Sequence, residues 1–307
     1  VAFARTQEPS TAATQFMSGE LLRQFEDYYD KGLFLRQPSV EAWASLQYLL
    51  FREGSSGVVL GKDGWLFSNE EYRVPGAYQQ ALEEHLSRIA EVEKTLKAHN
   101  KRLILLPLPL KLDVYEEYAS RAPDARAKAL YDDFLSGLRA QRIEVAPLRE
   151  AFLAQKEQQP LFLPTDTHWT PYGAQRTAKI VGAKVRAMPE FADIPKREFE
   201  TTRSGRMGKT GTLHNMAGQL CGTSYAIQYM DQFTTEPKGE AGDGDLFGDS
   251  GNPQITLVGT SHSGKNYNFA GFLEQEIGAD ILNVAFPGGG LEGSMIQYLG
   301  SDEFQKS

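Results

Sequence analysis

Hydrophobic positions in the middle of the chain alternate between two patterns, the spacing of amphipathic helices and short apolar runs that suit buried strands. One long helix is predicted by apolar residues that recur every three or four positions, at Leu82, Leu86, Ile89, Val92 and Leu96. The chain then predicts a strand near Leu103, a helix over 124–141 and a strand over 143–146. Because strand and helix alternate, the pattern predicts an α/β fold with a largely parallel sheet flanked by helices.

Less regular segments surround this core pattern. The segments 15–31 and 39–52 predict helices, and we assign residues 1–56 to an N-terminal linker and helical lead. Short strands at 58–60 and 65–67 flank the turn Lys62-Asp63-Gly64 and predict a hairpin. Between about residues 198 and 253 the pattern breaks into a Gly- and Thr-rich stretch, of which Tyr225–Met230 is the most strand-like part. We interpret this stretch as an insertion, beside the active site, in a domain that covers residues 57–307.

A candidate nucleophile lies in the C-terminal part of the chain. The β-rich run 254–258 ends in Gly259-Thr260-Ser261, and apolar residues at helical spacing follow over 265–277. Ser261 is therefore expected at a strand-to-helix turn, with its hydroxyl at the carboxyl edge of a sheet and the N–H groups of a helix start nearby to receive an oxyanion. The alternative is that Ser261 or Ser263 only caps the helix.

A candidate acid and base come earlier, in Asp166-Thr167-His168-Trp169. Side chains two apart in an extended segment share one face, so Asp166 can accept a hydrogen bond from Nδ1 of His168 and leave Nε2 as the base. Thr170-Pro171 then reads as a helix cap followed by proline in the first turn. Taken alone, an Asp-x-His sequence is more often an aspartate in a turn beside a partly buried histidine whose hydrogen bonds are satisfied, with no catalytic role. Together with Ser261, these residues supply the parts of an acyl-transfer triad.

The surroundings of Ser261 discriminate between classes of serine enzyme. Ser263 stands where the Gly-x-Ser-x-Gly elbow of α/β-hydrolases requires its last glycine. A Gly-Thr-Ser turn at a strand end instead resembles the Gly-Asp-Ser block of SGNH hydrolases. After the next predicted strand, 280–286, the glycines Gly288, Gly289 and Gly290 resemble the block that supplies an oxyanion-hole glycine in those enzymes. A plain flexible turn is the alternative for this stretch.

The order of the motifs gives a narrower resemblance. Asp-x-His-Trp precedes the Gly-Thr-Ser strand, and the segments 61–67 and 102–115 are similar to segments of the alginate O-acetyltransferases of the AlgJ/AlgX family. The likeness runs from about Gly57 to the end and implies an SGNH-hydrolase-like fold with a permuted motif order. AlgX carries a C-terminal carbohydrate-binding module for which no room follows, so we expect the nearer relation to be with AlgJ. A helix-like stretch to Leu299 and a polar tail end the sequence, whereas a full SGNH-like sheet would have one more strand, so we expect that a C-terminal segment is missing.

The resemblance and the triad together predict double displacement. His168 would take the proton of Ser261, Ser261 would attack an acetyl donor, and the acetyl group would pass to a sugar hydroxyl, while Asp166 orients His168. By resemblance, a membrane-bound O-acyltransferase delivers the acetyl group, and mannuronate in alginate or a second acetyltransferase accepts it. The family implies a periplasmic location, with an N-terminal signal anchor in the inner membrane that is absent from this chain. Trp169 and Tyr172 are candidate substrate contacts, and packing is the alternative role.

Charge and composition limit the partners. Forty acidic and 32 basic residues give a net charge of −8, which argues against nucleic acid and repels a long polyanion overall. The segment 196–209 is the clear basic cluster, either a substrate contact or a solvated loop. No apolar run approaches the ~20 residues that cross a bilayer. Cys221 is the single cysteine, so no internal disulfide is possible.

No cofactor or metal is expected from the sequence. The five histidines include no His-Glu-x-x-His, and the acidic stretch 243–249 does not fit the spacing of an EF-hand loop. Two other functions stay open. One is a carbohydrate acetylesterase with the same triad, in which water resolves the acyl-enzyme, and the other is a non-catalytic scaffold of a polysaccharide modification or export complex.

Overall fold

The computed structural model describes residues 57–74, 76–217, 225–239 and 253–306. The predicted helices 15–31 and 39–52, the cysteine Cys221 and the acidic stretch 243–249 lie outside the described residues. Nearly all described residues belong to one unit, which comprises 56–216 and 225–307. The proposed domain boundary near residue 57 stays a prediction.

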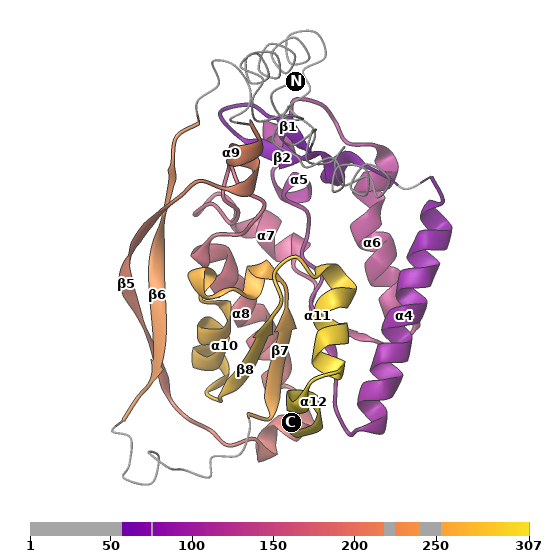
Figure 1. Cartoon of the computed structure of the whole chain (residues 1–307), viewed down its shortest axis with the longest axis vertical. Helices are drawn as coiled ribbons and strands as arrows, with labels where there is room; N and C mark the ends of the chain where they lie inside the picture. Colours follow the sequence, from indigo (N-terminus) through magenta and orange to yellow (C-terminus); the bar gives the residue numbers. More distant parts are fainter. Residues whose placement is uncertain (1–56, 75, 218–224, 240–252, 307) are drawn as a thin grey trace, which may run out of the picture. The chain divides into compact units, whose positions relative to one another are not determined.

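Two pairs of parallel strands form the α/β part of this unit, and the pair β7–β8 can be followed in Figure 1. β3 (Ile104–Leu105) pairs with β4 (Glu144–Val145), and β7 (Ile255–Gly259) pairs with β8 (Ile281–Ala285). The chain passes from β3 to β4 through α6 (Ala125–Ala140) and from β7 to β8 through α10 (Phe269–Ile277). These are β–α–β connections, as the alternating pattern predicted, and the α/β class is confirmed. In detail, the described strands pair in twos, and two of the four pairs are antiparallel.

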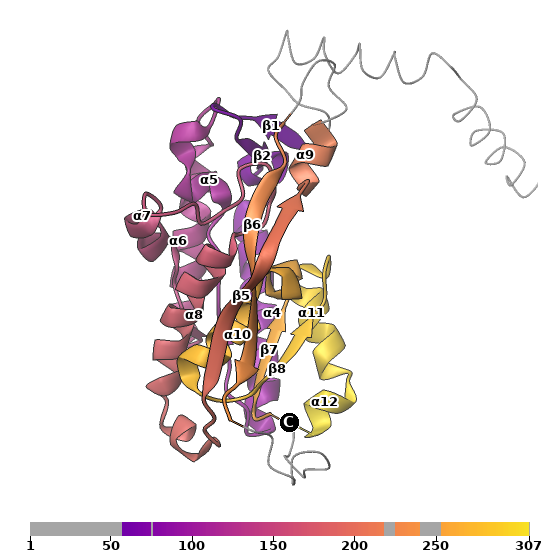
Figure 2. The ribbon, with the colours of Figure 1, turned by 90° about the vertical axis from the view of Figure 1, so that its left-hand side faces the viewer.

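Helices lie on both faces of the β7–β8 pair (Figures 1 and 2). α10 packs against α8 (Pro171–Arg186) on one face, and α11 (Gly290–Leu299) contacts both strands on the other. The apolar positions of α10 recur at helical spacing and are buried, namely Phe269, Phe272, Leu273 and Ile277. The long predicted helix is α4 (Tyr78–Ala98), and its Leu82, Leu86 and Ile89 share one core cluster with residues of α6.

An antiparallel hairpin precedes these elements. β1 (Val58–Leu60) pairs with β2 (Leu66–Ser68), and Asp63 and Gly64 in the turn have positive φ, as the Asp-Gly sequence predicted. Leu66 is fully buried, and its N–H donates to the carbonyl of Pro164 at 2.9 Å. The hairpin therefore supports the loop that carries Asp166.

Shorter elements connect the main ones. They are η2 (Asn69–Tyr72), α5 (Lys111–Val114), η3 (Glu116–Tyr118), α7 (Arg149–Gln155), η4 (Pro189–Asp193), α9 (Thr212–Ala217), η5 (Ser261–Ser263), η6 (Lys265–Tyr267) and α12 (Asp302–Lys306). The helix-like stretch that was predicted to end at Leu299 is α11, and the described residues end in α12.

The Gly- and Thr-rich stretch forms a long antiparallel ribbon where the pattern predicted mostly irregular chain. β5 (Phe199–Lys209) pairs with β6 (Gln228–Pro237) along their whole length, with a register shift between Arg203 and Gly205. The ribbon lacks the alternation of hydrophobic and polar residues that signals a strand, because most side chains of β5 and β6 are exposed or half-buried. In Figure 2 the ribbon runs alongside α10 and α8, and it contacts both helices.

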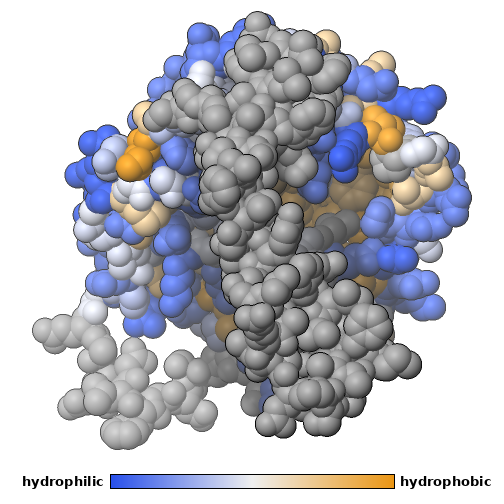
Figure 3. Space-filling model, turned by 45° about the horizontal axis from the view of Figure 1, so that its top comes forward, coloured by the Kyte–Doolittle hydropathy of each residue, from blue (hydrophilic) through white to orange (hydrophobic). Residues whose placement is uncertain are grey.

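Polar side chains cover most of the surface that can be seen. Figure 3 shows predominantly hydrophilic residues at the end of the unit near β1 and α9, with small apolar patches between them. Among the described residues, no helix has both the length and the hydrophobicity needed to cross a membrane.

Candidate active site

Asp166 and His168 lie on a tight loop between α7 and α8. The loop folds back on itself, because Phe162 and Trp169 form an isolated antiparallel bridge and the N–H of Leu163 donates to the carbonyl of His168 at 3.0 Å. Thr170 closes the loop, and its Oγ1 accepts the N–H of Gly173 at the start of α8. The predicted helix cap and the proline that follows it are both present.

The loop places the carboxylate of Asp166 against the imidazole of His168. Nδ1 of His168 lies 3.0 Å from Oδ1 of Asp166, and a carboxylate can only accept, so Nδ1 carries the proton and Nε2 is left unprotonated. Asp166 has only 1% of its side chain exposed. Burial alone would raise the pKa of Asp166, but the hydrogen bond and charge of His168, together with Lys209, hold that pKa well below its usual range.

Ser261 follows β7 in a single turn of 3₁₀-helix. Gly259 ends the strand, Thr260 is extended and η5 begins at Ser261. Ser263 is buried, and both its N–H and its Oγ donate to the carbonyl of Thr260, at 3.1 and 2.9 Å. A Cβ added to Gly259 would lie 2.2 Å from Oγ of Ser263, so the turn closes only over a glycine. Ser263 therefore shapes the turn, and Ser261 is the serine that meets the base.

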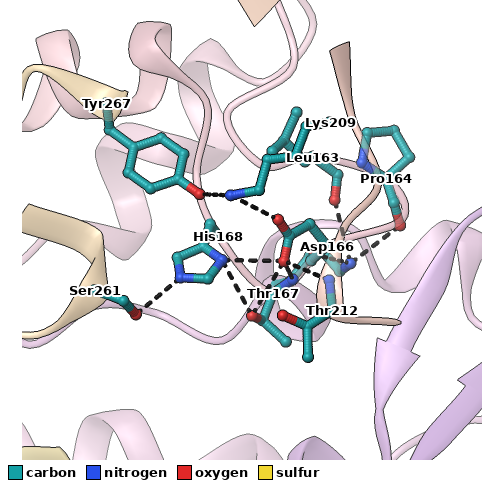
Figure 4. A network of polar contacts seen from close by, with 10 residues as sticks. Leu163, Pro164, Asp166, Thr167, His168, Lys209, Thr212, Ser261 and Tyr267 are labelled. Carbon is teal, nitrogen blue, oxygen red and sulfur yellow. Dashed lines mark hydrogen bonds and ion pairs between the residues drawn. The ribbon is translucent and has the colours of Figure 1, made fainter. Parts of the chain in front are cut away.

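The predicted nucleophile, base and acid come together although they are distant in sequence. Oγ of Ser261 lies 2.8 Å from Nε2 of His168, across a separation of 93 positions. Figure 4 shows the continuous chain of contacts from Ser261 through His168 to Asp166. This geometry can move the serine proton to Nε2 while the carboxylate compensates the imidazolium, which is the requirement for an activated serine nucleophile.

Two aromatic rings pack against the imidazole of His168. The ring of Tyr267 stacks on it at 5.3 Å and 15°, and the ring of His262 lies 4.9 Å away on a tilted plane. Burial and the neighbouring charge of His168 lower the pKa of His262 to about 4, so His262 is neutral near pH 7. His262 could have replaced His168 as the base by sequence position alone, but the structure gives it a packing contact with His168.

The other face of Asp166 is covered by the corner between β5 and α9. The N–H of Thr212 donates to Oδ1 at 3.3 Å, and Nζ of Lys209 lies 3.0 Å from Oδ2. A Cβ on Gly211 would fall 2.4 Å from Cβ of Asp166, so only glycine permits this approach. Sequence reasoning missed these residues. Their one signal was the basic cluster 196–209, which ends at Lys209.

A buried lysine binds the backbone of the loop that carries Asp166. Nζ of Lys111 donates to the carbonyls of Leu163, Pro164 and Asp166, at 3.3, 3.1 and 2.7 Å, which uses all three ammonium protons. Burial lowers the pKa of Lys111 to about 8, while the carboxylates of Glu71 and Asp166 oppose the decrease. The sequence pattern assigned no role to Lys111. Its contacts make it a support for the backbone of Asp166.

The glycine-rich turn after β8 lies beside the nucleophile turn. Gly259 and Ala285 are paired residues at the ends of β7 and β8, and the N–H of Phe286 donates to the carbonyl of Gly259 at 2.9 Å. The N–H of Gly289 donates to the carbonyl of Phe286 at 3.2 Å. Because the N–H of Gly289 is already used within this turn, we keep its neighbour Gly288 as an oxyanion candidate. It has a positive φ and open space around its Cα.

Neither predicted aromatic contact lies open beside Ser261. Trp169 is 1% exposed, and its Nε1 donates to the carbonyl of His262 at 2.9 Å, so it holds the nucleophile turn against the Asp166 loop. Tyr172 donates its hydroxyl to Gln158 and stacks with Arg176. Both contacts correspond to the packing alternative. The described residues contain no cluster of three or more His, Cys, Asp or Glu that could hold a metal ion.

Residues 58–307 match the family model of the SGNH hydrolase-like domain of the acetyltransferase AlgX. AlgX from Pseudomonas fluorescens is 57% identical over 274 residues, which are 84% of this chain and 54% of that protein. This chain therefore spans about half the length of that relative.

Similarity extends to the AlgJ proteins. A probable alginate O-acetylase AlgJ from Pseudomonas aeruginosa is 36% identical over 313 residues, 97% of this chain and 78% of that protein. The solved O-acetyltransferase domain of Pseudomonas putida AlgJ matches with a TM-score of 0.72 and 32% identity, covering 82% of this chain and 87% of that one. The expected nearer relation to AlgJ rested on chain length, whereas the sequence identity is higher for AlgX.

Proposed function

The chain belongs to the family of the SGNH hydrolase-like acetyltransferase domain of AlgX, and from this membership we propose that it is an O-acetyltransferase of alginate biosynthesis that works through an acetyl-serine. The observation that carries the proposal is the pair of contacts at His168. One imidazole nitrogen lies 2.8 Å from Oγ of Ser261, and the other lies 3.0 Å from the carboxylate of Asp166. A serine in this setting is activated for acyl transfer.

The reaction would proceed in two displacements. In the first, Nε2 of His168 takes the proton of Ser261, Oγ bonds to the acetyl carbon, and the leaving group departs with that proton. In the second, His168 takes the proton of the acceptor hydroxyl, the acceptor oxygen bonds to the acetyl carbon, and Oγ leaves and regains a proton. Asp166 stays ionised throughout and compensates the imidazolium.

The oxyanion of each tetrahedral intermediate requires hydrogen-bond donors. We propose that these donors are the backbone N–H groups at the start of η5 and the backbone N–H of Gly288. η5 follows the carboxyl end of β7, and Gly288 follows the carboxyl end of the adjacent parallel strand β8. Loss of one such donor typically slows acyl transfer by about 10²- to 10³-fold.

Donor, acceptor and location are further parts of the proposal. The relatives are described as alginate biosynthesis proteins and O-acetylases, which supports a polysaccharide hydroxyl, that of mannuronate, as the final acceptor. We propose that a membrane-bound O-acyltransferase supplies the acetyl group, and that the protein acts in the periplasm, tethered to the inner membrane. The net charge of −8 repels a long polyuronate, which supports transfer through a second acetyltransferase as one route.

Hydrolysis is a second candidate function that the same contacts support. Water could resolve the acetyl-serine in place of a sugar, and the protein would then be a carbohydrate acetylesterase. The scaffold hypothesis gains no support from the site, because His168 stands within hydrogen-bond distance of both Ser261 and Asp166.

Intact-protein mass spectrometry after brief incubation with p-nitrophenyl acetate tests the proposal. We expect an acetyl adduct on the parent and on Ser263→Ala, the matched control in the same turn, and none on Ser261→Ala or His168→Ala. Addition of mannuronate oligomers should then move the acetyl group to sugar, whereas an esterase would release free acetate at the same rate with or without oligomer. An adduct that survives Ser261→Ala would refute the assignment of the nucleophile.

A further inference from the structure

The two carboxylate oxygens of Asp166 are compensated in different ways. Oδ1 accepts from the backbone N–H groups of Thr167 and Thr212, at 2.7 and 3.3 Å, and from Nδ1 of His168. Oδ2 is buried. The group that faces it is the ammonium of Lys209, at an ion-pair distance of 3.0 Å.

Lys209 is held at this position by a residue that also contacts the base. Its ammonium contacts the hydroxyl of Tyr267 and lies 4.6 Å from the centre of the Tyr267 ring. The same ring stacks on His168 at 5.3 Å. In Figure 4 the contacts run from Tyr267 to Lys209 and on to Asp166. Lys209 therefore links two residues, Tyr267 and Asp166, that each contact His168. Lys209 is 19% exposed, which leaves its charge little screened.

We propose that Lys209 is a positioning residue of the site, which shares the carboxylate of Asp166 with His168 and so sets how readily the base gives up its proton. The inference rests on the proposed function. A carboxylate bound to two cations stabilises each of them less than it would stabilise one alone. Lys209 therefore favours the neutral imidazole, the form that accepts the serine proton.

The other groups that face this carboxylate and imidazole do not replace the charge of Lys209. Lys111 from α5 contacts the backbone carbonyl of Asp166 rather than its carboxylate. His262 from η5 is neutral, with a pKa near 4. Burial and the charge of Asp166 raise the pKa of the Tyr267 phenol, which stays protonated. Lys209 is thus the cation that the described structure places on Oδ2.

The test is the pH dependence of Ser261 acetylation by p-nitrophenyl acetate, followed by nitrophenolate release between pH 5 and 9. Lys209→Met should move the acid limb of the profile upward by roughly one pH unit, which is a loss of about tenfold on that limb. Lys209→Arg keeps the charge and should retain the parent limb. Tyr267→Phe removes the hydroxyl that holds Lys209 and should give a smaller upward movement.

A merely structural role predicts a different result, in which Lys209→Met lowers the rate by one factor at all pH values. That result, or an unchanged profile, would overturn the inference. A second readout does not depend on turnover. The downfield proton signal of Nδ1–H of His168, identified by its absence in His168→Ala, should shift in Lys209→Met and not in Lys209→Arg. An unacetylated parent with this shift would refute the proposed function and leave the inference standing, and an unshifted signal would overturn the inference.

Discussion

Gly259→Ala is the substitution for which the structure gives the sharpest expectation. Gly259 ends β7, two residues before the proposed nucleophile, and its φ is not in the positive range, so alanine fits its backbone conformation. A Cβ at this position would lie 2.2 Å from Oγ and 2.8 Å from Cβ of Ser263. Ordinary van der Waals contact begins at about 3.4 Å, so the turn from Ser261 to Ser263 must move by roughly 1 Å.

The cost follows from the rigidity of that turn. Ser263 is buried and bonded twice to the carbonyl of Thr260, so it cannot rotate away without loss of a hydrogen bond. Overpacking of this kind typically costs 1–3 kcal/mol, and a lost hydrogen bond adds about 1 kcal/mol. We therefore expect the free energy of unfolding to fall by about 2–4 kcal/mol. The contact of 2.8 Å between Ser261 and His168 should lengthen, with a loss of about 10²-fold in the rate of acetylation.

Urea unfolding and the p-nitrophenyl acetate assay measure both effects. Gly205→Ala is a matched control, because its Cβ would meet only the tip of Gln232, at 3.5 Å. The double variant Gly259→Ala with Ser263→Gly removes both clashing atoms, so it should recover much of the loss. Parental stability and acetylation rate in Gly259→Ala, or a double variant no better than the single one, would refute the steric argument.

Three further predictions concern the loop that carries the acid and base. The folded-state pKa of Asp166 lies below its ordinary value of 3.8, so its carboxylate stabilises the fold fully above about pH 4 and loses this contribution as the pH falls. Unfolding titrations should show a shallower acid slope for Asp166→Asn, and equal slopes would contradict this. Trp169→Phe removes the donor to the carbonyl of His262 and should cost about 1–3 kcal/mol in urea unfolding and slow acetylation, unless a water molecule replaces the indole N–H. Thr170→Ala should cost about 1 kcal/mol in thermal unfolding through the lost cap of α8, and Thr170→Ser, which keeps the cap, should stay close to the parent.

Local patterns predicted the elements around the candidate site because each depends on neighbouring residues. The cap at Thr170, the hairpin turn at Asp63-Gly64 and the strand end at Gly259 are all decided within a few positions. The same holds for Asp166 and His168, which are two residues apart. The helix predicted over 265–277 begins only at Phe269, since Asn268 in the left-handed region interrupts the chain after η6.

Contacts between distant segments were not predictable from these patterns. Lys209 lies at the end of a ribbon that lacks hydrophobic alternation, and its approach to Asp166 depends on how β5 crosses the unit. Lys111 likewise finds its three carbonyl acceptors on a loop more than 50 positions away. Trp169 was assigned two possible roles because a sequence does not show which side of a loop faces the core. Its burial is a property of the assembled fold.

Because 93 positions separate His168 from Ser261, we expect the proposed nucleophile to meet its base only late in folding. Closure of so long a loop is entropically costly, and contacts of high sequence separation slow the folding of single domains. Before α10 docks against α8, Ser261 lacks the imidazole contact that the proposed mechanism needs, and we expect its hydroxyl to react no faster than that of any other serine. A newly made chain would thus be protected from premature acetylation, and the appearance of the acetyl adduct during refolding would time the moment at which the two halves of the site meet.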